Sequence, residues 1–286
     1  MIGTVPEMLV CPLCRRKLSL CSRTLRCPDG HCYDMAASGY VNLLPPGKMN
    51  NARTGDDKDM LRSRSRFLER GYYSAISETA ALLLDLGQRN KNAKTVFVDA
   101  GSGEGWHTAN IAATLEKAGA DCIGIGFEAS KNGANLAGRR ALKTGNRRLF
   151  FAAANIFSMP VSDSCIDAVF SMFAPIPGQE AYRILKPASP LIAVSAGPKH
   201  LWEMRSILYG EPRESDKKLP CPAGFELSKE KSLEYNITVQ ADDIKDLFTM
   251  TPFYYRCPSD GRERLLGMTE PLKTRVCVNY SVFIKK

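Results

Sequence analysis

The sequence predicts an α/β protein with a doubly wound parallel sheet, preceded by a small cysteine-rich module. Short apolar segments alternate with amphipathic segments from Thr95 onward, which is typical of β-α units in a parallel sheet. Half of the ten cysteines lie within residues 11–32, and such clustering is typical of a small metal-binding module. A chain of 286 residues accommodates one large domain with this appendage.

The composition narrows the class of protein. Hydrophobic residues make up 44% and charged residues 24% of the chain, which is usual for a soluble protein with a core. We find no apolar run of about eighteen residues and no signal-peptide pattern, so we expect a cytoplasmic protein without a membrane span. The net charge is +9, and more than half of it falls in residues 1–70. This surplus indicates either affinity for polyanions or a solubilising surface.

The cysteine-rich module contains two closely spaced pairs of metal-binding residues. Cys11-x2-Cys14 is followed, after twelve residues, by Cys27-x3-His31. Thiolate and imidazole are the ligands that Zn²⁺ prefers, and four of them complete a tetrahedral structural site. Cys32 directly follows His31 and is an alternative fourth ligand. A disulfide framework or free thiols is the competing interpretation, which a reducing compartment disfavours.

The region after this module predicts a loop and then two helices. Residues 45–59 are polar, contain glycine and proline, and have no apolar period, which indicates a loop or linker. Residues 60–86 carry apolar side chains at helical spacing. Gly71 interrupts this pattern, so we expect a break between two helices near Tyr72 and Tyr73.

The rest of the chain predicts the main sheet. Residues 95–100 form a short, continuously apolar strand of the kind buried in parallel sheets, and a glycine-rich turn and a helix follow. Further strands are expected within residues 121–128, 148–160, 165–175, 190–198, 232–239 and 279–286, and helices within 130–142, 178–186, 200–210 and 242–250. We therefore assign residues 1–44 to the zinc-binding module, 45–94 to a linker with helices, and 95–286 to the main domain.

The turn after the first strand indicates which ligand the sheet binds. It reads Asp99-x-Gly101-x-Gly103-x-Gly105, which differs from the G-x-G-x-x-G spacing of dinucleotide-binding folds. The D-x-G-x-G-x-G spacing suits S-adenosylmethionine, because its ribose and amino acid carry no phosphate. Glu128 ends the second strand, where an acid can accept hydrogen bonds from both ribose hydroxyls. The alternative is a glycine-rich connection in an unrelated α/β protein.

Taken together, these motifs resemble the RlmA family of 23S rRNA (guanine-N1)-methyltransferases, which includes the tylosin-resistance methyltransferases. The resemblance covers nearly the whole chain. A cysteine cluster that precedes this glycine turn in one chain is more specific to the family than either motif alone. The segments that carry it are CPLC (11–14), CPDGH (27–31), YDMAASGYVNLLP (33–45), the RFLERGYY region within 64–73, DAGSGEG (99–105), FAP (173–175), GPKHLWE (197–203) and MTPF (250–253).

The resemblance implies a Rossmann-like class I methyltransferase that transfers a methyl group from S-adenosylmethionine to N1 of a guanine in the hairpin 35 region of 23S rRNA. The family's zinc ligands fall on Cys11, Cys14, Cys27 and His31, in preference to Cys32. Its S-adenosylmethionine contacts fall on Tyr73, Gly103, Glu104 and His200. The residues themselves add Asp99, Gly101 and Glu128 to the expected cofactor site.

The substrate side is less defined by the sequence. Guanine N1 lies on the pairing edge, so the target base must be unpaired, and an aromatic such as Phe173 or Tyr72 could stack on it. A core position is the competing interpretation for Phe173. No residue is identified as the catalytic base. We expect the zinc module and the arginines at Arg62, Arg64 and Arg66 to contact the RNA backbone.

Two other functions remain open at this point. One is a small-molecule methyltransferase, in natural-product biosynthesis for example, whose zinc module only supports the fold. The other is a non-catalytic RNA-binding homologue. The basic N-terminal quarter favours an RNA partner over a small molecule, and the complete glycine turn favours an enzyme. The resemblance also raises the expectations of a homodimer and of macrolide resistance.

Overall fold

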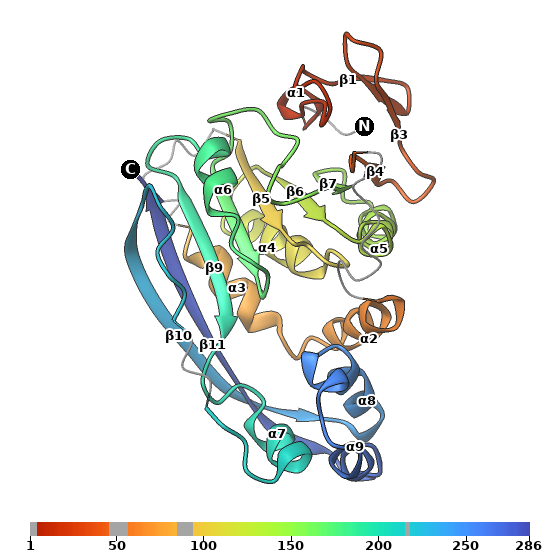
Figure 1. Cartoon of the computed structure of the whole chain (residues 1–286), viewed down its shortest axis with the longest axis vertical. Coiled ribbons are helices and arrows are strands. Elements are labelled where there is room, and N and C mark those ends of the chain that lie inside the picture. The colour runs from red at the N-terminus through yellow and green to blue at the C-terminus, as the bar shows by residue number, and fades with distance from the viewer. Residues whose placement is uncertain (1–4, 46–56, 85–93, 215–217) are drawn as a thin grey trace.

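A central sheet organises the molecule, which we describe from a computed structural model over residues 5–45, 57–84, 94–214 and 218–286 (Figure 1). In this part of the chain eight strands form one sheet in the order β10-β11-β9-β8-β5-β6-β7-β4. The strands are β4 (Val41–Asn42), β5 (Thr95–Ala100), β6 (Cys122–Glu128), β7 (Leu149–Ala153), β8 (Ala168–Met172), β9 (Pro190–Ala196), β10 (Phe225–Val239) and β11 (Leu272–Lys285).

The predicted parallel sheet is confirmed, with an antiparallel extension at one edge. Strands β4 to β9 pair in parallel, and β10 and β11 are antiparallel to their neighbours. The β10 and β11 strands are both longer than predicted, because β10 pairs with β11 along its whole length. The added part of β10, residues 225–231, is mostly exposed and lacks an apolar alternation. Backbone pairing rather than side-chain pattern therefore makes it a strand.

Helices cover both faces of the sheet. One buried cluster packs α3, α4, α5, α7 and α8 against the sheet. The other face is covered by α6 and by the N-terminal module, whose Leu9, Leu18 and Leu25 belong to the second buried cluster. The helices are α2 (Lys58–Glu69), α3 (Ser74–Leu82), α4 (Trp106–Lys117), α5 (Lys131–Lys143), α6 (Gly178–Ile184), α7 (Trp202–Tyr209), α8 (Ala241–Thr249), α9 (Ser259–Leu266) and the 3₁₀ turn η1 (Pro252–Tyr255).

The break between α2 and α3 falls at the predicted place, where Gly71 has φ +82°. The α9 helix was not predicted, because its sequence SDGRERLL has only two apolar residues. Most of the loop expected over residues 45–59, and the end of the helix expected to reach Leu86, lie outside the described residues. None of the helices described is long and apolar enough to cross a membrane.

The α2 helix is fixed beyond the carboxyl ends of the parallel strands, beside α8 (Figure 1). Asp57 caps its first turn by accepting hydrogen bonds from the backbone N–H groups of residues 59 and 60. Arg66 makes a two-pronged contact with Asp246 on α8, with nitrogen–oxygen distances of 2.7 and 2.5 Å. Arg70 contacts Asp243 at 3.2 Å. These pairs hold α2 over the region where a ligand would bind.

The N-terminal module joins the main sheet directly. It contains α1 (Val5–Met8) and the antiparallel strands β1 (Ser19–Cys21), β2 (Thr24–Arg26) and β3 (Cys32–Asp34). The chain then adds β4 to the edge of the main sheet, with Val41 opposite Ala152. Arg15 also donates to the carbonyl of Met159 at 2.9 Å. The module is therefore anchored at its start and at its end.

Gly138 on α5 lies against this module, so we expect a methyl group there to disturb the contact. A Cβ on Gly138 would lie 2.4 Å from the carbonyl oxygen of Ser38. Gly→Ala inside a helix normally stabilises by about 1 kcal/mol, but overpacking costs about 1–3 kcal/mol. We expect Gly138→Ala to lower the free energy of unfolding in chemical denaturation, whereas Arg139→Ala at the exposed neighbouring position changes it little. A more stable Gly138→Ala protein would contradict this packing.

Candidate zinc centre and active site

Four side chains in the N-terminal module converge on one point. The ligand atoms of Cys11, Cys14, Cys27 and His31 all lie within 4.8 Å of one another. His31 Nδ1 is 3.5 Å from Cys11 Sγ and 3.3 Å from Cys27 Sγ, and the thiols of Cys14 and Cys27 are 3.6 Å apart. A zinc–sulfur bond of about 2.3 Å gives a tetrahedron edge of about 3.8 Å. The donors and their spacing therefore fit Zn²⁺.

Two tight turns bring these ligands together. In the first, the backbone N–H of Arg15 donates to the carbonyl of Cys11 at 2.9 Å. In the second, Gly30 has φ +83° and donates to the carbonyl of Cys27 at 3.0 Å. Cys32 is exposed, and its thiol contacts the carbonyl of Gly30 instead of the cluster. The geometry thus selects His31 rather than Cys32 as the fourth ligand.

We expect Cys14→Ala to lose the bound zinc and to destabilise the first 44 residues, because three remaining ligands no longer close the tetrahedron. Metal content by plasma emission spectrometry and thermal unfolding are the measurements. Cys32→Ala is the matched control and should keep about one zinc per chain. Full metal content in the Cys14→Ala protein would overturn the ligand assignment.

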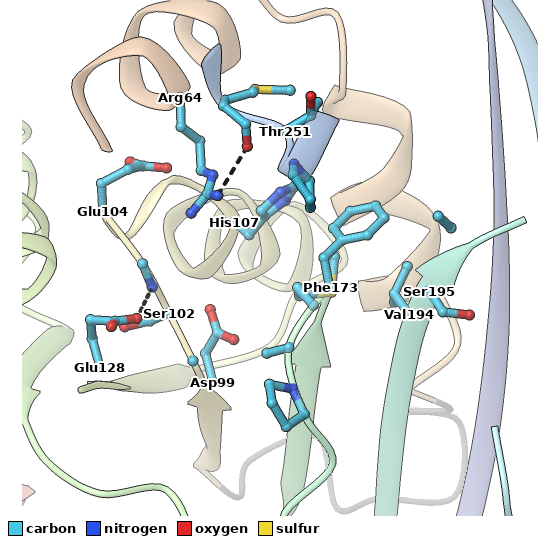
Figure 2. Close-up of a pocket in the computed structure, with 18 of the residues that line it drawn as sticks. Arg64, Asp99, Ser102, Glu104, His107, Glu128, Phe173, Val194, Ser195 and Thr251 are labelled. Carbon is cyan, nitrogen blue, oxygen red and sulfur yellow. Dashed lines mark hydrogen bonds between the residues drawn. The ribbon is translucent and has the colours of Figure 1, made fainter. Parts of the chain in front are cut away.

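A pocket of about 840 Å³ lies at the carboxyl ends of β5, β6, β8 and β9 (Figure 2). The α2 helix and the segment 250–253 also line it. These elements are far apart in the sequence and meet only in the fold. All seven residues predicted to contact the cofactor line this pocket: Tyr73, Asp99, Gly101, Gly103, Glu104, Glu128 and His200.

The glycine turn forms a cradle at the floor of the pocket. Gly103 has φ +56°, and a Cβ there would extend toward the side chain of Arg64, 3.6 Å away. At Gly105 a Cβ would lie 2.8 Å from that of Ala137, so only glycine allows α4 and α5 to approach. Glu128 holds the turn by accepting hydrogen bonds from the backbone N–H groups of Gly103 at 3.0 Å and Ser130 at 2.8 Å. The Glu128 carboxylate is therefore held in a fixed position beside the pocket.

Asp99 has a buried oxygen that lacks a partner. Its Oδ2 accepts a hydrogen bond from the Thr108 hydroxyl at 2.5 Å, whereas Oδ1 is buried and makes no hydrogen bond. Burial raises the pKa of Asp99 from its ordinary value of 3.8 to about 7, against the lowering effect of the Thr108 hydrogen bond. Buried polar atoms are normally satisfied, so this oxygen fits a site that receives a donor from a ligand.

The side chain of Glu104 is held by contacts within the protein. Its carboxylate is almost fully buried, lies 2.9 Å from Arg140 Nη2 and accepts the backbone N–H of Trp106 at 3.2 Å. Arg140 also donates to Ser65 on α2 at 2.9 Å. The Glu104 side chain is therefore occupied within the protein, and the turn's backbone faces the pocket. No sequence pattern identified Arg140 as its partner.

Tyr73 and His200 form a directed hydrogen-bond chain. The backbone N–H of Cys277 donates to His200 Nδ1 at 3.3 Å, so this nitrogen is an acceptor. Burial lowers the pKa of His200 to about 4, which keeps the ring neutral at pH 7 with its proton on Nε2. Nε2 lies 3.1 Å from the Tyr73 hydroxyl and donates to it. The Tyr73 proton is then directed to other acceptors, including a ligand in the pocket.

Phe173 is displayed at the pocket rather than packed in the core. Its side chain is 42% exposed and its backbone has φ +54°, which is uncommon for a residue with a side chain. The centre of its ring lies 6.2 Å from that of His107 (Figure 2) and 6.0 Å from that of His200. Strained backbone of this kind concentrates at functional sites. Tyr72, the other aromatic considered, donates to Asp243 and does not line the pocket.

The three arginines expected to contact RNA do not form one exposed face. Arg64 lines the pocket, whereas Arg62 and Arg66 extend toward solvent, with 63% and 59% of their side chains exposed, and Arg66 also pairs with Asp246. Helical periodicity explains why Arg64 differs, because Arg62 and Arg66 lie four residues apart on one face of α2, whereas Arg64 is turned by about 200° from each of them. The expected RNA contacts of Arg62 and Arg66 stay a prediction, whereas Arg64 lies in the pocket and not on their exposed face.

The fold and the pocket define a class I S-adenosylmethionine-dependent methyltransferase with an N-terminal zinc ribbon. Comparison with known families finds a match for each of these two parts. The family described as "RlmA, N-terminal", a zinc ribbon, matches residues 9–49. The family described as "Methyltransferase domain" matches residues 91–241. Both parts of the expected architecture are thus present in one chain.

Curated relatives match nearly the whole chain. The YxjB protein of Bacillus subtilis (strain 168), which is named as a 23S rRNA (guanine-N(1)-)-methyltransferase, is 31% identical over 262 residues, 89% of each chain. The 23S rRNA (guanine(748)-N(1))-methyltransferase of Streptomyces fradiae is 27% identical over 288 residues, 97% of each chain. This chain belongs to the RlmA family of methyltransferases.

Proposed function

We propose that this enzyme transfers a methyl group from S-adenosylmethionine to N1 of a guanine in 23S rRNA, in the hairpin 35 region. The observation that carries the proposal is the near full-length match to relatives named for this activity, which includes both the zinc ribbon and the methyltransferase domain. The pocket supports it with a polar floor and an exposed aromatic ring at Phe173. A cytoplasmic location, where ribosomal RNA is available, accompanies this proposal.

The residues of the pocket divide among the parts of the cofactor. Glu128 accepts hydrogen bonds from the ribose hydroxyls, and the backbone around Gly101, Gly103 and Glu104 approaches the ligand closely. Asp99 accepts from the amino group through its unpartnered oxygen. Tyr73, oriented by His200, donates a hydrogen bond from its hydroxyl to the ligand. The sulfonium supplies an already activated methyl group, so the protein's main task is to align the reactants.

Phe173 is the proposed platform for the target guanine. Stacking on an aromatic side chain is worth about 1–3 kcal/mol per base in single-stranded recognition, and N1 is reachable only when the base is unpaired. His107 lies nearby, but burial lowers its pKa to about 3 and the charges of Arg64 and Arg140 act in the same direction. Because His107 is such a weak base, Phe173 and His107 contribute mainly by positioning the guanine and not by abstracting its proton.

The zinc module, residues 1–44, is the proposed RNA-recognition unit, connected through residues 45–94 to the methyltransferase domain, 95–286. The surplus of basic residues in residues 1–70 supports this assignment, because phosphate contacts dominate the affinity of proteins for RNA. Binding should therefore weaken with salt. A homodimer and macrolide resistance stay predictions from the family resemblance.

The decisive experiment incubates the enzyme with labelled S-adenosylmethionine and ribosomal RNA that lacks the modification, followed by nucleoside mass spectrometry. We expect 1-methylguanosine in 23S rRNA. Phe173→Ala should lower the methylation rate about 10- to 100-fold, because one base-stacking contact is lost, while cofactor affinity by calorimetry stays near wild type. Label in a small molecule but never in RNA would favour a natural-product methyltransferase, and no transfer to any acceptor would favour a non-catalytic homologue.

Asp99 predicts a pH dependence of cofactor binding. An ammonium partner requires the ionised carboxylate, so affinity should rise as the pH increases through about 7 and fall below it. In the ligand-free protein, the free energy of unfolding depends on pH in the opposite direction. A raised folded-state pKa gives stability that is present below 3.8 and is lost as the pH rises through about 7. The measurement is the cofactor affinity, determined by calorimetric titration at several values between about pH 5.5 and about pH 8.5. Asp99→Asn should flatten the profile, and an unchanged profile in that variant would exclude the assignment.

A further inference from the structure

The pocket contains an unusual balance of charge. Among the described residues that line it, Arg64 is the only lysine or arginine, whereas Asp99, Glu104 and Glu128 all carry carboxyl groups. Burial lowers the pKa of both histidines in the pocket, to about 3 and about 4, so neither is positive at pH 7. Any anionic group of a ligand bound here therefore has one cationic side chain to meet.

The position of Arg64 is fixed by two parts of the protein. It extends from α2, which the ion pairs with α8 hold in place, and its Nη2 donates to the carbonyl of Met250 at 3.3 Å (Figure 2). Its Nη1 lies 3.6 Å from the point where a Cβ of Gly103 would be. The guanidinium is thus held directly over the glycine turn, on the side open to the pocket. Its donors are rigidly arranged, which suits a carboxylate.

We propose that Arg64 binds the carboxylate of the amino-acid end of S-adenosylmethionine. The inference rests on the proposed function, in which this pocket holds that cofactor. The ribose and the ammonium already have carboxylate acceptors in Glu128 and Asp99, and the remaining charged group of the ligand is its carboxylate. Because Gly103 has no side chain, the space between the glycine turn and the Arg64 guanidinium is not filled by this residue.

A phosphate of the RNA is the other anion that could reach an arginine. Arg64 is half-buried beneath the segment 250–253 and beside the glycine turn, whereas Arg62, two residues earlier on α2, is exposed. A contact to the RNA backbone suits the exposed position better. The location within the cofactor pocket favours the carboxylate, and the phosphate becomes an outcome of the test.

The test compares two ligands that differ in the amino-acid end. S-adenosylhomocysteine carries the carboxylate, whereas 5′-methylthioadenosine keeps the adenosine and sulfur but lacks it. We measure calorimetric affinities of both for wild type, Arg64→Gln, Arg64→Lys and the matched control Arg62→Gln. Arg64→Gln should weaken S-adenosylhomocysteine about 10- to 100-fold, as expected for a lost charge-assisted pair, and change methylthioadenosine less than about twofold. Arg64→Lys should recover part of the loss, and Arg62→Gln should bind both of these ligands as wild type does.

Each outcome decides a different statement. If wild-type protein binds neither S-adenosylmethionine nor S-adenosylhomocysteine, the proposed function itself fails. If wild type binds and Arg64→Gln binds equally well, the role given to Arg64 is wrong. An equal loss for both ligands, or a lowered melting temperature that accounts for it, would assign Arg64 a structural role. Normal cofactor affinity with weakened RNA binding and a smaller salt dependence would make Arg64 a phosphate contact, which also overturns the inference.

Discussion

The buried ion pair between Glu104 and Arg140 is the constraint on which the active site depends. Glu104 belongs to the glycine turn and Arg140 to α5, and Arg140 reaches on to Ser65 and Glu69 of α2. One guanidinium thus fixes three elements relative to one another. Removing one member of such a buried pair leaves an uncompensated charge and typically costs about 3–5 kcal/mol. The position of the turn, and with it the shape of the pocket floor, follows from this pair.

Two carboxylates hold the same turn from opposite sides. Glu128 accepts the backbone N–H of Gly103, while Glu104 is tied back to Arg140. The turn is therefore rigid before any ligand arrives, which reduces the ordering cost of binding. Asp99, by contrast, retains a buried oxygen without a partner. The glycine turn thus has its hydrogen bonds made within the protein, while one Asp99 oxygen is left to accept a hydrogen bond, as a preorganised binding site requires.

The zinc centre and the methyltransferase pocket are linked through α5. One face of this helix packs under the glycine turn, where Ala137 lies next to Gly105, and Gly138 lies against the backbone of the zinc module. The module also supplies β4 to the sheet edge. Metal binding therefore organises a surface that is continuous with the catalytic domain. A unit proposed to recognise RNA can in this way be held in a defined position relative to the methyl-transfer site.

The sequence by itself determined the parallel sheet, the break in the helical pattern at Gly71, the paired spacing of the zinc-binding cysteines and the glycine turn, because each depends on short-range spacing or on local backbone chemistry. It did not determine the partners of Glu104 and Arg64, the direction of the Tyr73–His200 hydrogen bonds, or the display of Phe173. These depend on which distant elements meet: Arg140 and Glu104 are 36 residues apart, and Cys277 and His200 are 77 residues apart. Long-range packing, which leaves no period in the sequence, decided these features.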